Sequence, residues 1–177
     1  MCKKQINALT LPQLAEQLKE MGQPAFRAKQ IFHWLHQKQV SEFSQMTDQP
    51  KTLLAKLEEE YDIVRLTIQR RQQSKDGTVK YLFGLPDGNC IETVVMRYTY
   101  GNTVCVSTQV GCRMGCRFCA STQAGLVRSL TAGEIAAEIY AAQADIGQRI
   151  SHIVLMGIGE PLDNFDNVMD FLTIISC

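Results

Sequence analysis

Three cysteines lie close together in the 177-residue sequence, at Cys112, Cys116 and Cys119. They form the pattern C-x3-C-x2-C in a loop that follows a predicted strand. Three thiolates on one short loop can bind three irons of a [4Fe-4S] cluster. The fourth iron then stays open to a chelating cofactor, the arrangement that cleaves S-adenosylmethionine reductively. A zinc site is the alternative, with Cys105 as its fourth ligand, although the resulting spacing is unusual for zinc.

A glycine-rich turn, MGIGEP at residues 156–161, follows the apolar segment SHIVLM. Glycines at the carboxyl end of a strand expose backbone groups to a ligand, and Glu160 can accept hydrogen bonds from an amino group there. Such turns are common between strands and helices, so this pattern alone is a weak indication. Because the turn lies one βα unit after the cysteine loop, it predicts a second wall of the same pocket.

The composition is that of a soluble globular protein, with 45% hydrophobic and 20% charged residues. No apolar run approaches the length of a transmembrane helix, and the N-terminus does not resemble a secretory signal. The seven cysteines therefore indicate a metal or redox site in the cytoplasm and not a framework of disulfides.

Positive charge gathers where negative charge is absent. The chain has 18 basic and 18 acidic residues, yet no acidic residue lies between Glu92 and Glu134. The arginines of that stretch are Arg97, Arg113, Arg117 and Arg128. They indicate a patch facing phosphates or an anionic cofactor, with a chance basic loop as the alternative.

Residues 1–62 are predicted to form an N-terminal helical accessory domain. Thr10 can cap a first helix, and Pro24 and Pro50 can open a second and a third. The apolar face of the second helix is expected to contain Phe26, Ile31, Trp34 and Leu35.

Residues 63–98 are predicted to form a β-hairpin extension. Apolar and polar residues alternate at 63–71 and 79–85, on either side of an Asp-Gly pair that is typical of hairpin turns. A second turn leads into a strand at 90–97.

Residues 99–177 are predicted to begin a (β/α) barrel, which makes the fold class α/β. Strands are expected at 103–108 and 151–156. Thr131 should cap the helix between them, and Asp163 or Asn164 the helix after them. Only about two βα units are present and the sequence ends within an apolar pattern, so we expect a truncated piece of a larger enzyme. A natural small protein is the alternative.

Longer segments resemble the bacterial adenine-C2 RNA methyltransferases of the radical S-adenosylmethionine (radical SAM) superfamily. The similar segments are PAFRAKQIFHWL, IETVVM, VCVSTQVGCRMGCRFCAST, LTAGEI and MGIGEPL. These enzymes methylate C2 of one adenine in 23S rRNA and, in dual-specificity members, of an adenine in tRNA. The resemblance covers nearly the whole chain.

The resemblance implies that Cys112, Cys116 and Cys119 bind the [4Fe-4S] cluster. It also places Gly159 and Glu160 in the turn that binds the second cofactor, S-adenosyl-L-methionine. An electron donor such as flavodoxin with its reductase is implied as a partner, beside the RNA, for a cytoplasmic monomer with no membrane attachment.

The resemblance further implies two residues that act late in the reaction. Glu92 matches the acceptor of the C2 proton, and Cys105 matches the cysteine that resolves an RNA–protein thioether by forming a disulfide. The methyl-carrying cysteine would lie beyond residue 177, so we expect this fragment to be inactive alone. Cys2 and Cys90 match no role in the family.

Two other functions stay open at this point. One is a C8-methylating, antibiotic-resistance relative of the same enzymes. The other is a stand-alone module that binds RNA through its basic helical domain and a metal through its cysteines. The absorbance of the reconstituted protein separates this module, as a colourless zinc protein, from a brown iron–sulfur enzyme.

Overall fold

A computed structural model describes residues 3–177, so Cys2 lies outside the described residues. The chain divides into two compact units, one formed by Met1–Val64 with Asp170–Cys177 and the other by Arg65–Met169. The helices are α1 (Leu11–Glu20), α2 (Phe26–His36), α3 (Lys51–Glu60), α4 (Ala132–Ile146) and α5 (Phe165–Ile175). The strands are β1 (Lys4–Gln5), β2 (Tyr61–Asp62), β3 (Thr67–Gln73), β4 (Val79–Gly84), β5 (Cys90–Tyr98), β6 (Gly101–Cys105), β7 (Gln109–Gly111), β8 (Leu126–Ser129) and β9 (Ile150–Val154). Short 3-10 turns lie at Ile6–Ala8, Phe43–Gln45, Ala120–Thr122 and Pro161–Asn164.

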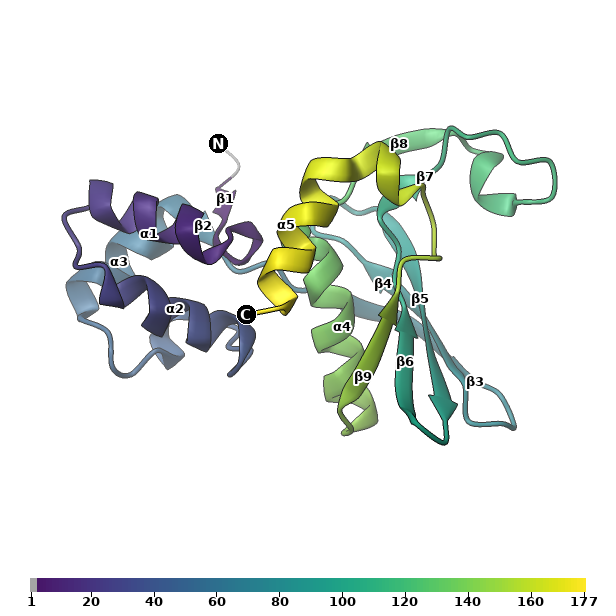
Figure 1. Cartoon of the computed structure of the whole chain (residues 1–177), viewed down its shortest axis with the longest axis horizontal. Helices are drawn as coiled ribbons and strands as arrows, with labels where there is room; N and C mark the ends of the chain where they lie inside the picture. The colour runs from purple at the N-terminus through teal and green to yellow at the C-terminus, as the bar shows by residue number, and fades with distance from the viewer. Residues whose placement is uncertain (1–2) are drawn as a thin grey trace. The chain divides into compact units, whose positions relative to one another are not determined.

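The first unit contains the predicted helices α1, α2 and α3 (Figure 1). Thr10 and Gln13 form a capping box at the start of α1, as the N-cap chemistry predicts. Ile31 and Leu35 are buried on α2, which agrees with the predicted apolar face. Phe26 is 53% exposed, however, so its assignment to that face was wrong.

Trp34 is also not a fully buried core residue, because it is half-buried. Its indole Nε1 donates a hydrogen bond to Asp48 Oδ1 at 2.6 Å. A tryptophan needs a partner for this N–H group, and a carboxylate at the surface supplies it here. Phe32 takes the buried place on the helix at 6% exposure.

The second unit is built on a five-stranded sheet with the strand order β3-β4-β5-β6-β9. The first four strands are antiparallel neighbours, and β9 pairs with β6 in parallel. Gly77 lies in the turn before β4 with φ +85°, as the predicted Asp-Gly hairpin requires. The strand predicted at 63–71 begins later, at Thr67, and its alternating burial was wrong, because all seven residues of β3 are exposed.

Helix α4 covers one face of this sheet, as Figure 1 shows. The residues of that face are fully buried, and they include Tyr81, Phe83, Val95 and Val104. Alternate residues of β5 on the other face are only partly buried. The units β6–α4 and β9–α5 are two βα units in the order that the sequence predicts, and the fold is mixed α/β. The expected division at residues 62 and 98 remains a prediction.

A small hairpin of β7 and β8 flanks the cysteine loop. The sequence did not predict this hairpin, because strands of three and four residues leave almost no periodic pattern. The last helix begins directly after Asn164, one of the two residues predicted to cap it, but a 3-10 turn precedes it. Glu160 caps a 3-10 turn at Pro161–Asn164, and α5 follows from Phe165. No helix among residues 3–177 is long and apolar enough to cross a membrane.

Candidate cofactor and metal site

The glycine-rich turn is hydrogen-bonded along the segment that leads from β6 to the cysteine loop. Gly157 N donates to Val106 O at 3.0 Å. Thr108 N and Gln109 N both donate to Ile158 O, at 2.8 and 3.2 Å. These backbone bonds fix the turn beside residues 106–109, only three residues before Cys112.

Two glycines are necessary for this close approach. A Cβ atom at Gly157 would lie 2.6 Å from Val106 O. Gly159 has φ +105°, and a Cβ atom there would lie 2.6 Å from Gln109 Cβ. Both distances are too short for real atoms, and the φ of Gly159 disfavours any other residue. The glycines therefore let the two segments pack directly on each other.

Gln109 connects the turn to the sheet from a fully buried position. Its Oε1 accepts a hydrogen bond from Glu160 N at 3.0 Å. Its Nε2 donates to Asp163 Oδ2, also at 3.0 Å. Asp163 in turn forms an ion pair with Arg113, between the first two cysteines of the loop. Gln109 and Asp163 thus join the cysteine loop to the Glu160 turn.

Asn164, like Asp163, forms hydrogen bonds with segments that surround the site. Its Nδ2 donates to Thr108 O and Leu130 O, each at 2.8 Å. Asn164 directly precedes Phe165, the first residue of α5, as expected for one of the two predicted caps, and its capping hydrogen bond remains a prediction. Sequence patterns identify capping residues from local spacing, whereas these side chains bond to segments more than thirty residues away.

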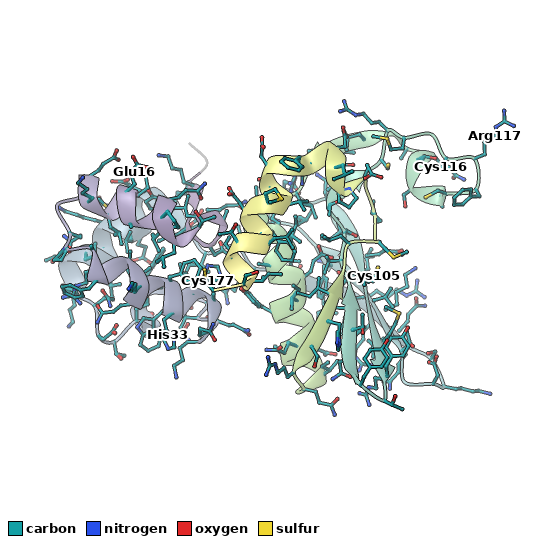
Figure 2. The ribbon with its side chains drawn as sticks, in the orientation of Figure 1. Glu16, His33, Cys105, Cys116, Arg117 and Cys177 are labelled. Carbon is teal, nitrogen blue, oxygen red and sulfur yellow. The ribbon has the colours of Figure 1, made fainter. Side chains whose placement is uncertain are left out.

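The three cysteines of the motif differ in exposure. Cys112 is buried, Cys116 is exposed and Cys119 is half-buried, and all three are free thiols. Figure 2 shows Cys116 beside Arg117 on the loop that β7 and β8 flank. Within residues 3–177 no three His, Cys, Asp or Glu side chains are grouped closely enough to hold a metal ion. The three thiols therefore lie on one loop, but their sulfur atoms are not close enough together to bind one metal centre.

The donor set nevertheless fits an iron–sulfur cluster. Its ligands are soft thiols, and none of the three is bound in a disulfide. The base of the loop is held by Cys112 N, which donates to Gly125 O at 3.1 Å. Phe118, which precedes Cys119, is 95% exposed and does not cover the cysteines in this arrangement of the loop.

Glu92 and Cys105 lie on the same face of the sheet. Cys105 pairs with Val94 across β5 and β6, and Glu92 is two residues from Val94, which places it on the same side. This is the face opposite α4. Cys105 is also the last residue of β6 and pairs with Val154 at the end of the parallel strand β9. It therefore lies at the carboxyl edge of both strands, where the cysteine loop and the glycine turn begin (Figure 2).

The two side chains have different surroundings. Glu92 Oε1 lies 2.7 Å from Lys80 Nζ, and both side chains are more than 40% exposed. Burial raises the pKa of the Cys105 thiol, while a hydrogen bond with the Met156 backbone acts in the opposite direction. Cys105 is therefore held as a thiol at neutral pH.

Half of the predicted basic patch is neutralised by carboxylates. Arg113 pairs with Asp163, and Arg128 pairs with both Glu134 and Asp87. The pKa of Asp87 falls to about 2, chiefly because Arg128 donates a hydrogen bond to it. Arg97 and Arg117 are exposed, and for them the role of facing an anion remains a prediction.

Sequence reasoning missed Glu138, Ser107 and Gln109. Glu138 is fully buried on α4, although its position among isoleucines and alanines could have indicated an acidic side chain within an apolar stripe. No sequence signal singles out Ser107 or Gln109, because both act through contacts with distant segments.

This arrangement of strand, cysteine loop, helix, strand and glycine turn defines a radical SAM domain. Residues 106–177 match the family model of the radical SAM superfamily. The chain also resembles the crystal structure of a radical SAM methyltransferase from Sphaerobacter thermophilus. The TM-score is 0.88 and the identity 43%, over 98% of this chain and 52% of that one.

The particular family follows from the first unit and from full-length relatives. Residues 5–63 match the family model of the ribosomal RNA large subunit methyltransferase N-terminal domain. A probable dual-specificity RNA methyltransferase RlmN from Clostridium perfringens is 56% identical over 98% of this chain and 50% of its own length. A protein of the same name from Halalkalibacterium halodurans is 53% identical over 97% of this chain and 48% of its own length. Nearly the whole chain is therefore similar to RlmN-type radical SAM proteins, and it spans about half the length of these relatives.

Proposed function

We infer that this chain carries the cluster- and cofactor-binding part of an enzyme that methylates C2 of an adenine in 23S rRNA. A tRNA adenine is proposed as the second substrate, in keeping with the dual specificity named for the relatives. The observation that carries this inference is the bonding of the Gly157–Glu160 turn to residues 106–109, which lead into the cysteine loop.

Each proposed ligand has a place in this arrangement. Cys112, Cys116 and Cys119 would bind the [4Fe-4S] cluster. The turn at Gly159 and Glu160 would bind the amino end of S-adenosylmethionine, because backbone groups there lie at a strand's carboxyl edge. When bound, cluster and cofactor supply the one-electron chemistry that an electron-poor adenine carbon requires.

Two side chains of the sheet are proposed to complete the reaction. Glu92 would accept the proton from C2, and its carboxylate beside Lys80 is half-exposed and therefore accessible. Cys105 would resolve the RNA–protein thioether by forming a disulfide, with its thiol at the same carboxyl edge as the turn. The described cysteines are all free, as a resolving thiol must be before the reaction.

The remaining partners are proposed from the family. The enzyme would receive electrons from a donor such as flavodoxin and would act in the cytoplasm as a monomer. The exposed Arg97 and Arg117 are the basic side chains of the acid-free stretch that remain available for RNA phosphates.

Anaerobic reconstitution of the chain with iron and sulfide tests the first part of this function. We expect a brown protein with about one [4Fe-4S] cluster per chain, whose EPR signal shifts when S-adenosylmethionine is added. A colourless protein that binds one zinc ion instead would contradict it.

A complete enzyme that carries this sequence tests the second part. The Cys105→Ala variant should leave protein covalently attached to substrate RNA on a denaturing gel, because the thioether then has no thiol to resolve it. Glu92→Gln should slow deprotonation by roughly 10²–10⁴. Both variants should retain a full complement of iron. Normal turnover by Cys105→Ala without an RNA-shifted band would return Cys105 to a purely structural role.

A further inference from the structure

Glu138 is a carboxyl group at the centre of the contact between α4 and the sheet. It is fully buried, and its Oε2 accepts hydrogen bonds from Ser107 N at 3.0 Å and from the Thr93 hydroxyl. Its Oε1 is buried without a hydrogen-bond partner in the described part of the chain. The nearby carboxylate of Glu134 is already paired with Arg128, so no described cation offsets a charge on Glu138.

Ser107 connects Glu138 to the proposed site through hydrogen bonds. Its hydroxyl donates to Glu92 O at 2.7 Å and accepts a hydrogen bond from Ile158 N at 3.0 Å. One residue is thus bonded to α4, to the strand that carries Glu92 and to the glycine turn. Glu138 accepts the hydrogen bond from the backbone N–H of Ser107.

An aliphatic side chain would suit the packing at this position better. It would avoid the free-energy cost of burying a carboxyl group that has no cationic partner. It would also leave Ser107 N buried without an acceptor and would release Thr93. The carboxyl therefore stabilises one local geometry at the expense of favourable burial.

We propose that Glu138 is a positioning residue that acts through Ser107 to hold the Gly157–Ile158 backbone and the Glu92 strand in place for the cofactor. The proposal rests on the proposed function of the turn. Burial, the largest cause, raises the pKa of Glu138 well above its ordinary value, so a neutral acceptor should perform the same task. Glutamine is such an acceptor, and leucine of similar volume is not.

Hydrogen exchange of the chain, without any cofactor, tests the structural part of this proposal. We expect Glu138→Leu to accelerate exchange in peptides that cover residues 105–110 and 155–160 by about tenfold or more, because a buried N–H loses its acceptor. Glu138→Gln should exchange at the wild-type rate. Ser107→Ala should accelerate residues 155–160, and the double variant Ser107→Ala with Glu138→Leu should add little.

Ile135→Ala is the matched control for a general loss of α4 packing. Ile135 is fully buried on the same helix and makes no hydrogen bond to Ser107. We expect it to lower the midpoint of unfolding while the two peptides keep their wild-type exchange under native conditions. Equal acceleration by Ile135→Ala, or unchanged exchange in Glu138→Leu, would overturn the proposal.

Titration of the cluster-loaded chain with S-adenosylmethionine, followed by EPR, tests the functional part. We expect Glu138→Leu to weaken cofactor binding about tenfold with its iron content retained, and Glu138→Gln to bind as wild type does. Wild-type affinity in Glu138→Leu, or equal damage from glutamine and leucine, would overturn the positioning role. If wild-type chain bound no cofactor, the proposed function would fail, while the exchange experiment would still decide the role of Glu138.

Discussion

Arg113 of the cysteine loop is bonded to Asp163 of the segment that follows Glu160, with Arg113 Nε 3.1 Å from Asp163 Oδ1. The two residues are fifty positions apart in the sequence. Asp163 also accepts a hydrogen bond from Gln109, and Gln109 Oε1 accepts one from Glu160 N. The loop that would hold the cluster and the turn that would hold the cofactor therefore share one carboxylate.

Asp163→Asn should loosen the cysteine loop with little effect on global stability. The amide keeps an oxygen for Gln109 but loses its ionic attraction to Arg113. The Asp163 side chain is 11% exposed and that of Arg113 63%, so water screens the arginine end and the loss of global stability should be small. Hydrogen exchange of residues 112–119 should accelerate. Asp166→Asn, at an exposed position in the first turn of α5, is the control that should change nothing. Identical exchange in both variants would show that the pair does not order the loop.

Cys116→Ala should abolish cluster assembly although its thiol is the most exposed of the three. Two remaining thiolates cannot hold three irons of a cubane cluster. Iron and sulfide content and the visible absorption after reconstitution measure this loss. Cys90→Ala is the matched control, because Cys90 is likewise a free, exposed cysteine and should leave the iron content unchanged. Full iron content in Cys116→Ala would exclude the cluster assignment.

Gly159→Ala should destabilise the protein more than Gly88→Ala. Both glycines have positive φ, but a Cβ atom at Gly88 meets nothing within 4 Å, whereas one at Gly159 lies 2.6 Å from Gln109 Cβ. Gly88→Ala then costs only backbone strain, about 1–2 kcal/mol. Gly159→Ala adds displacement of the turn, so its free energy of unfolding should fall further and cofactor binding should weaken. Equal losses in denaturant titrations of the two variants would contradict this difference.

The helical unit should lose stability as pH falls below about 6.5. Burial lowers the pKa of His36 to about 4, so between these values the unfolded chain binds a proton that the folded chain does not. Stability is therefore full above the unfolded pKa and falls by about 3 kcal/mol as pH drops to 4. Denaturant titrations between pH 8 and 4 measure the change.

His36→Gln is the variant that isolates this effect, since it removes the titrating group and keeps a polar side chain. Its stability should depend less steeply on pH than that of the wild type between pH 6.5 and 4. His33, on the exposed side of the same helix, provides the control His33→Gln, which should keep the wild-type slope. A wild-type slope in His36→Gln would place the pH dependence elsewhere.

Local chemistry was readable in the sequence. The cysteine spacing, the Thr131–Glu134 capping box and the Asp-Gly hairpin turn each depend on residues a few positions apart, and the described structure contains the last two as predicted. The helical period of the apolar residues and the capping residues likewise located α1, α3 and α4. These features could be predicted because short-range spacing determines which atoms meet within one turn of chain.

The tertiary structure decided which distant segments meet. Pairing of Cys105 with Val94 and Val154 places it on the open face with Glu92, and a shift of one residue would have turned it toward α4. Gln109, Asp163 and Glu138 acquire their roles only because β6, β9 and α4 bring their partners within hydrogen-bond distance. No local pattern encodes such contacts, since they depend on strand register and helix packing between residues thirty or more positions apart.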